Sequence, residues 1–132
     1  MTGTPASARL SAVLALLVVA GCTSLPPVML NGKADGKRVE LARGQELVLS
    51  LEENPTTGFR WEVVQRAAAV IEIVGEGRYA AASTGRVGSG GTTTWRFRAT
   101  RTGSDTLRLV YRRSWEKDQP PAESFSCTVN VR

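Results

Sequence analysis

Five short segments of the chain alternate apolar and polar residues with a period of two, and this alternation limits the folds that the chain can adopt. Successive side chains of a β-strand point to opposite faces, so each segment would present one apolar face if it were extended. The apolar positions of the five segments are Leu47, Leu49 and Leu51; Phe59, Trp61 and Val63; Trp95, Phe97 and Ala99; Leu107, Leu109 and Tyr111; and Phe125, Cys127, Val129 and Val131.

Turn-forming residues separate these segments and predict the fold class. Residues 67–74 are ambiguous between a helical turn and a strand, and we interpret Val70 to Val74 as a strand. The turns are expected at residues 42–44, 54–58, 75–77, 85–91 and 102–104. This pattern predicts an all-β fold, an immunoglobulin-like antiparallel β-sandwich of about seven to eight strands whose facing sheets make the core.

The first 21 residues have the pattern of an export signal. Arg9 precedes an apolar run over residues 10–20, which has the length of a signal-peptide core and is shorter than the ~20 residues needed to span a bilayer. The run continues into Gly21 and Cys22, and "VVAGC" resembles the lipobox of bacterial lipoproteins. The resemblance implies that Cys22 is lipidated and becomes the first mature residue. An ordinary secretory signal with a nearby cysteine is the alternative.

The chain is therefore expected to have three parts: a lipoprotein signal peptide at residues 1–21, a lipidated N-terminus and tether at 22–37, and one domain at 38–132. Acyl chains on Cys22, at about 0.8 kcal/mol per buried CH₂, would hold the domain at a membrane. We expect a lipid-anchored protein of the cell envelope, outside the cytoplasm. Thr23 with no aspartate nearby favours the outer membrane if the organism is Gram-negative, and the facing of the domain stays open.

The composition excludes several kinds of site. The chain has no histidine, which removes Ser-His-Asp and Cys-His catalysis and histidine-containing zinc sites. We expect no catalytic residue, metal or cofactor. Once Cys22 is lipidated, Cys127 is the remaining cysteine, so no intramolecular disulfide can form. Cys127 is in phase with the core, and we interpret it as a buried small hydrophobe rather than a nucleophile.

The net charge does not favour a nucleic-acid partner. Removing residues 1–21 takes away one arginine and no acid, so the formal charge falls from +5 to +4. The arginines mostly fall at alternate positions of strand-like segments, as in "WRFRATR" at residues 95–101. This spacing is typical of solvated outer faces.

Residues 54–58, "NPTTG", form a loop with few accessible conformations. Pro55 fixes its own φ, Gly58 permits a positive φ, and Thr56 and Thr57 are stiff at χ1. A loop that is already ordered loses less entropy when it inserts into a partner's cleft. An inert turn is the alternative for this stretch alone.

Two further loops are larger than a chain reversal needs. In residues 85–93, Gly88, Gly90 and Gly91 have no side chains, so another chain could approach the backbone closely. A phosphate-binding loop is disfavoured because no Lys-Ser/Thr follows the glycines. A flexible connection is the alternative. Trp115 lies in a charged, proline-containing stretch beside arginines, which is the composition of an interface anchor. The alternative is that Trp115 caps one end of the sandwich.

In this order on an all-β chain, "NPTTGF", "GSGG" and Arg-x-Trp resemble the chagasin-type inhibitors of papain-like cysteine peptidases, over roughly residues 39–132. In that family an immunoglobulin-like sandwich presents three loops side by side at one end, and they wedge into the peptidase's active-site cleft. The resemblance implies that the peptidase-binding residues are Asn54, Pro55, Thr56, Thr57, Gly58, Phe59, Gly88, Ser89, Gly90, Gly91, Arg113 and Trp115.

The resemblance also implies a role for each loop. Thr56 and Thr57 are expected nearest the partner's catalytic cysteine, the glycines along the cleft in a strand-like contact, and Trp115 against the enzyme's wall. The family commonly has Arg-Pro-Trp where this chain has Ser114 in the middle position. Losing that φ restraint should make the third loop less preorganised.

The sequence therefore predicts a reversible, tight-binding inhibitor that occludes the cleft of a papain-like peptidase, and we expect a monomer. A membrane-anchored adhesion or scaffold module is the alternative. A hydrolase built around Ser89 or Thr57 lacks a visible base and is disfavoured.

Overall fold

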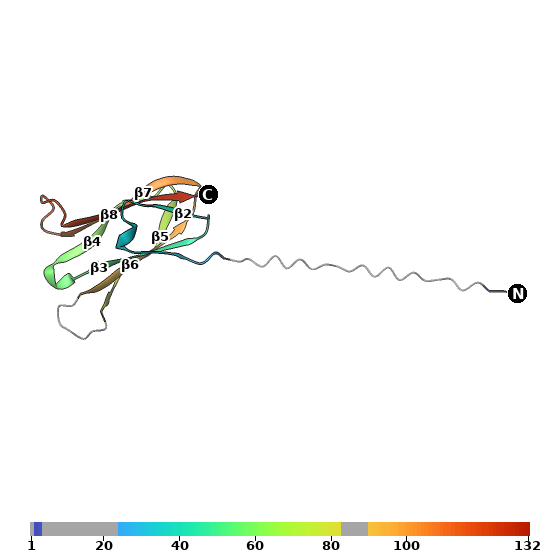
Figure 1. The fold of residues 1–132 in the computed structure, drawn as a ribbon, viewed down its shortest axis with the longest axis horizontal. Helices are drawn as coiled ribbons and strands as arrows, with labels where there is room; N and C mark the ends of the chain where they lie inside the picture. The colour runs from blue at the N-terminus through green and yellow to red at the C-terminus, as the bar shows by residue number, and fades with distance from the viewer. Residues whose placement is uncertain (1, 4–23, 83–89) are drawn as a thin grey trace.

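The alternating segments pair into two four-stranded sheets that pack face to face in the computed structural model, which describes residues 2–3, 24–82 and 90–132 (Figure 1). The sheet orders are β1-β3-β6-β5 and β2-β8-β7-β4. The elements are β1 (Val28–Leu30), η1 (Gly32–Ala34), β2 (Arg38–Leu41), β3 (Glu46–Glu53), η2 (Pro55–Thr57), β4 (Phe59–Arg66), β5 (Ile71–Ala81), β6 (Gly91–Ala99), β7 (Gly103–Arg113) and β8 (Glu123–Val131). The predicted all-β sandwich of seven to eight strands is confirmed.

The core consists of the apolar residues that the period-two pattern placed on one face of each strand. Leu47, Leu49, Phe97, Leu109 and Val129 are fully buried between the sheets. Burial of each such side chain stabilises the fold by roughly 1.5–3 kcal/mol, so the core holds the domain together. Within the described residues Cys127 is a free, buried cysteine.

The inward residues of β4 are less buried than those of the central strands because β4 is an edge strand. Phe59, Trp61 and Val63 are half-buried, and Trp61 and Val63 pack against the core from one side. The alternation predicted for β4 is present, but the inward-facing side chains of β4 lie at the edge of the sandwich and are only partly covered.

The N-terminal boundary of the domain differs from the expected one. Residues 28–34, which we assigned to the tether, form β1 and η1, and Val28 and Leu30 pack against the core. β1 pairs with β3 in parallel and β2 pairs with β8 in parallel, whereas we expected antiparallel pairs throughout. The chain adds a strand to the edge of each sheet before the antiparallel hairpins begin, which explains the two parallel pairs.

The turn expected at residues 75–77 is also absent. β5 runs through it from Ile71 to Ala81, with register shifts on both sides of Gly75. A Cβ on Gly77 would lie 2.8 Å from Nε1 of Trp95. Close packing against a core tryptophan, rather than chain reversal, explains the glycine.

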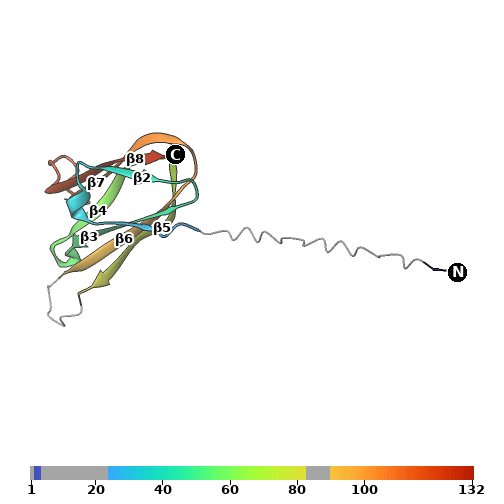
Figure 2. The same cartoon turned by 45° about the vertical axis from the view of Figure 1, so that its right-hand side comes forward.

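The connections between strands lie at two opposite ends of the sandwich, and the direction of each strand shows which end its connections occupy. β1 runs parallel to β3, and β3 leads into η2, so the chain reaches β1 from the end opposite η2 (Figure 2). No helix among the described residues is long and apolar enough to cross a membrane. The predicted signal peptide apart from residues 2–3, as well as Cys22, Gly88 and Ser89, lies outside the described residues.

Candidate functional site

Three connections meet at one end of the sandwich: residues 54–58, which we call the central loop; residues 82–90, the glycine loop; and residues 114–122, the tryptophan loop. Glu53 pairs with Gly91, so the central loop begins beside the end of the glycine loop. Phe59 pairs with Arg113, so the central loop ends beside the start of the tryptophan loop. The central loop therefore lies between the described ends of the glycine loop and the start of the tryptophan loop, at the left-hand end of the molecule in Figure 1.

The central loop is held in shape by its own side chains. Its middle forms the 3₁₀ turn η2, in which Pro55 occupies the first turn and Asn54 caps the N-terminus. Oδ1 of Asn54 accepts hydrogen bonds from the Thr56 amide at 3.3 Å and the Thr56 hydroxyl at 2.6 Å. The Thr57 hydroxyl donates to the Asn54 carbonyl at 2.7 Å. Both threonines thus restrain the loop through their hydroxyls in addition to their stiff χ1 angles.

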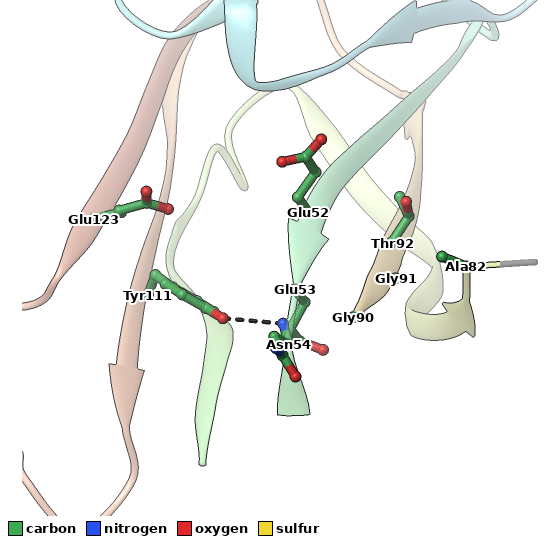
Figure 3. A pocket seen from close by; sticks show the side chains of 9 residues that line it. All are labelled: Glu52, Glu53, Asn54, Ala82, Gly90, Gly91, Thr92, Tyr111 and Glu123. Carbon is green, nitrogen blue, oxygen red and sulfur yellow. Dashed lines mark hydrogen bonds between the residues drawn. The ribbon is translucent and has the colours of Figure 1, made fainter. Parts of the chain in front are cut away.

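Tyr111 supports the central loop from below. Its hydroxyl accepts a hydrogen bond from the Asn54 amide at 3.1 Å (Figure 3). The Tyr111 ring stacks on Trp61 with a centroid distance of 5.0 Å and is tilted against Phe59 at 5.4 Å. The sequence pattern identified Tyr111 as a core-phase residue and missed the contact of its hydroxyl with the loop.

Glu53 joins the two sheets directly beneath the central loop, and sequence reasoning missed it. The carboxylate is 6% exposed; Oε1 accepts from the Trp61 amide at 2.8 Å, and Oε2 accepts from the Thr93 hydroxyl at 2.6 Å. Both oxygens are therefore satisfied, as a buried carboxylate requires. A signal was available, because Glu53 continues the inward face of Leu47, Leu49 and Leu51 as a charged residue.

Arg113 connects the central loop to the tryptophan loop. Its Nε donates to the Thr57 carbonyl at 3.0 Å, and Nη1 forms an ion pair with Glu116 at 3.3 Å. The guanidinium carbon lies 4.5 Å from the ring centroid of Phe59 and 6.0 Å from that of Trp115. The Arg113 side chain thus contacts the backbone of the central loop, the aromatic rings on both sides of it and an acidic residue of the tryptophan loop.

Trp115 is at the surface and rests against the central loop. Its side chain is 69% exposed, so it does not cap the sandwich as a buried residue would. Gly58 has φ +81°, and a Cβ on it would overlap Cη2 of the Trp115 indole. The glycine is therefore needed both for its left-handed backbone conformation and for the space that the indole occupies.

The described part of the glycine loop approaches neighbouring backbone closely. Gly90 has φ +73°, and a Cβ on it would lie 3.0 Å from the Glu53 carbonyl oxygen. Its own carbonyl accepts from the Ala82 amide at 2.9 Å, and a Cβ on Gly91 would overlap the Ala80 carbonyl. A hollow of about 460 Å³ at this end is lined by Asn54, Gly90 and Tyr111, among other residues. Figure 3 draws the side chains that line it, with Asn54 between Tyr111 and Gly90.

Cys127 lies in the core, away from these loops. Burial, together with the negative charge of Asp35, raises the pKa of its thiol from an ordinary 9.0 to about 11. The thiol is therefore neutral near pH 7 and unsuited to nucleophilic attack. The prediction that Cys127 is buried is confirmed.

Comparisons with known proteins extend over all three loops. The model of the Chagasin family peptidase inhibitor I42 matches residues 40–129. Amoebiasin-1 from Entamoeba histolytica is 30% identical over 96 residues, which cover 71% of this chain and 89% of that protein.

Two solved structures are similar in fold. The cysteine protease inhibitor EhICP2 from Entamoeba histolytica superposes with a TM-score of 0.72 at 23% identity, covering 81% of this chain and 96% of the other. The solution structure of amebosin has a TM-score of 0.61 at 31% identity, covering 80% and 99%.

Proposed function

The chain belongs to the chagasin family of peptidase inhibitors, and from this premise we propose that it inhibits papain-like cysteine peptidases reversibly and tightly by filling their active-site cleft with three loops. Membership of an inhibitor family assigns it no catalytic reaction of its own.

The observation that carries this proposal is the joint organisation of the central and tryptophan loops. Arg113 contacts both loops, and Gly58 packs against the exposed Trp115. Immobilising a flexible side chain on binding costs about 0.5–1.5 kcal/mol, so loops that are already ordered retain more of their contact energy. An exposed tryptophan held in place by its neighbours is suited to act as a binding anchor.

Inhibition would follow from occlusion. In the proposed complex Thr56 and Thr57 lie nearest the partner's catalytic cysteine, Gly88 to Gly91 run along the cleft, and Trp115 packs against its wall. Substrate is excluded because the cleft is full. The inhibitor needs no nucleophile or metal for this.

The same hydrogen bonds would protect the central loop from cleavage. The Thr57 carbonyl accepts from Arg113, and the Asn54 carbonyl accepts from the Thr57 hydroxyl. A peptide group held in this way cannot easily adopt the geometry that attack requires. If the loop were cut, Tyr111 and Arg113 would still hold its two sides together.

We also propose that Cys22 carries the lipid that anchors the protein to a membrane of the cell envelope, the outer membrane if the organism is Gram-negative. Support comes from the direction of β1, because the chain reaches the domain from the end opposite the loops and an anchor there would leave them accessible. Metabolic labelling with an alkyne analogue of palmitate tests the anchor. The full chain should be labelled and sediment with membranes, and Cys22→Ala should lose both properties.

Titration of papain and of a cathepsin L-type peptidase with residues 23–132 tests the inhibition. We expect stoichiometric, reversible loss of activity on a fluorogenic peptide substrate. No inhibition of either enzyme at micromolar concentration would contradict the proposal and would favour the adhesion or scaffold module instead.

A further inference from the structure

The end of the sandwich opposite the three loops is one continuous surface. Backbone hydrogen bonds join its turns: the Arg43 amide donates to the Arg132 carbonyl at 3.3 Å, and the Gly44 amide donates to the Ala99 carbonyl at 2.8 Å. The Arg101 amide donates to the Val70 carbonyl at 3.3 Å. The β2–β3, β4–β5 and β6–β7 turns therefore lie side by side with the end of β8. We call this surface the far end.

The far end is rich in arginine. Arg43, Arg66, Arg101 and Arg132 are all exposed there, and within the described residues none of them belongs to an ion pair. Four guanidinium groups with their charges uncompensated by close acids produce a positive potential over this end.

The nearby acidic side chains are already engaged. Asp105 accepts hydrogen bonds from the Ala69 amide at 3.1 Å and the Thr106 amide at 2.8 Å. Glu46 forms ion pairs with Arg96 and Arg98 at 3.4 Å each.

A further carboxylate is paired on a strand, because Glu40 forms an ion pair with Arg38 at 3.3 Å. These paired acids are not ion-pair partners of the far-end arginines, whose guanidinium groups are available to an external partner.

The loop end has mixed charge. Glu52, Asp118 and Glu123 are exposed there together with Arg60 and Lys117, and Glu116 pairs with Arg113. The far end is therefore the more positive of the two ends. An anionic surface attracts the more positive end more strongly and so orients the molecule.

An apolar residue lies at the basic end. Gln45 donates from Nε2 to the Pro26 carbonyl at 2.9 Å, which holds the incoming chain against the β2–β3 turn. Leu25, directly before Pro26, is 55% exposed. An exposed leucine next to a basic turn is a combination suited to binding at a lipid interface.

The proposed anchor would keep this end close to a bilayer. Residues 23–27 separate Cys22 from β1, and five extended residues span at most about 18 Å. Electrostatic attraction at physiological salt decays over about 8 Å, so the far end stays within a few decay lengths of the lipid surface.

We propose that the far end, through Arg43, Arg66, Arg101 and Arg132 with Leu25, binds anionic phospholipid headgroups and orients the inhibitor with its loops away from the membrane. This inference rests on the proposed lipid anchor for its place in the cell. β3 spans the sandwich with eight residues, so the central loop would stand about 26 Å further from the bilayer than the far end.

Sedimentation with phospholipid vesicles tests the surface itself, without the lipid on Cys22. The core cluster and the residues packed against it lie within residues 28–131, so residues 23–132 retain every core contact. We expect this chain to bind vesicles of mixed phosphatidylglycerol and phosphatidylcholine, to bind phosphatidylcholine alone much more weakly, and to be released by added salt.

The discriminating variant is Arg43→Gln with Arg101→Gln. Each basic residue near an anionic surface strengthens binding by roughly fivefold, so the pair should lower binding at least about tenfold. The matched control is Arg78→Gln with Arg108→Gln, which removes the same charge from exposed positions on β5 and β7 and should lower binding less than about threefold. Equal losses from both pairs, or equal binding to the two vesicle types, would overturn the inference.

The same preparations separate this inference from the proposed function. Arg43→Gln with Arg101→Gln should inhibit papain as the unchanged chain does, because both residues are far from the loops. Inhibition without vesicle binding overturns the lipid surface alone. Vesicle binding without inhibition overturns the inhibitor function alone.

Discussion

The two ends of the sandwich are built differently. The turns of the far end are closed by backbone hydrogen bonds, such as that from the Gly44 amide to the Ala99 carbonyl. The loop end depends on side chains: Asn54 caps its own loop, and Arg113 and Tyr111 hold that loop in place. Backbone hydrogen bonds tolerate many residue types, whereas the shape of the loop end depends on particular residues. Substitutions at the loop end should therefore affect peptidase inhibition, and similar substitutions at the far end should leave inhibition unchanged.

The sharpest form of this comparison is a pair of glycines. Gly58 and Gly44 both have positive φ, +81° and +84°, but only Gly58 faces another side chain. Gly58→Ala strains the backbone and displaces Trp115, so we expect the inhibition constant for papain to rise about a hundredfold, or about 2.7 kcal/mol.

Gly44→Ala is the matched control, because its Cβ would meet open space. We expect it to lower the free energy of unfolding by about 1 kcal/mol from backbone strain and to leave inhibition unchanged. Similar inhibition constants for the two variants would contradict the view that Gly58 positions Trp115.

Trp115→Ala tests the anchor directly. We expect the inhibition constant to rise at least tenfold, a loss of ~1.4 kcal/mol or more, because an exposed aromatic anchor is removed. Thermal unfolding should change little, since most of the side chain is already in solvent.

The buried Trp95 gives the opposite pattern and serves as the comparison. Trp95→Ala should lower the free energy of unfolding by about 3–5 kcal/mol. If Trp115→Ala destabilised the fold to that extent and left inhibition intact, Trp115 would be structural.

Arg113→Met should raise the inhibition constant by about three- to tenfold. Methionine keeps an apolar stem beside Phe59 but loses the hydrogen bond to the Thr57 carbonyl and the ion pair with Glu116. The loss should appear mainly in the dissociation rate, measured by surface plasmon resonance. Arg112→Met, which breaks the neighbouring ion pair with Glu62 on the outer face, should leave both values unchanged.

Ser114→Pro should tighten inhibition by about two- to fivefold. Proline restores the φ restraint that the family commonly has and lowers the number of conformations that the tryptophan loop can adopt, worth roughly 0.4–1 kcal/mol. Weaker inhibition by this variant would mean that Ser114 has a φ that proline cannot adopt.

Cys127 should have no effect on inhibition near neutral pH but should make stability depend on alkaline pH. The folded thiol keeps its proton up to about pH 11, whereas the ordinary pKa is 9.0. The contribution of the Cys127 thiol to the free energy of unfolding is therefore complete below pH 9. It is lost as the pH rises towards 11, at no more than about 1.4 kcal/mol per pH unit. Denaturant unfolding from pH 8 to pH 11 should show this extra slope, and Cys127→Ala should remove it.

Most strands and loops of the site could be predicted because their signals are local. The alternation in residues 47–51 and 107–111 requires an extended chain with one buried face, and the Asn-Pro-Thr-Thr-Gly stretch contains its own cap and its own left-handed position. The prediction of a turn at residues 75–77 was wrong because a glycine can serve either chain reversal or close packing. The local pattern cannot distinguish a glycine that reverses the chain from Gly77, which makes room for Trp95.

The sequence by itself determined that this protein is a β-sandwich with three unusual connections, because a period of two and the backbone restrictions of proline and glycine operate within a few residues. Only the tertiary structure decided how those connections become one surface. Arg113 is 56 positions from Thr57, and Thr93 is 40 positions from Glu53. Contacts at such separations depend on the register of both sheets, which no single segment contains.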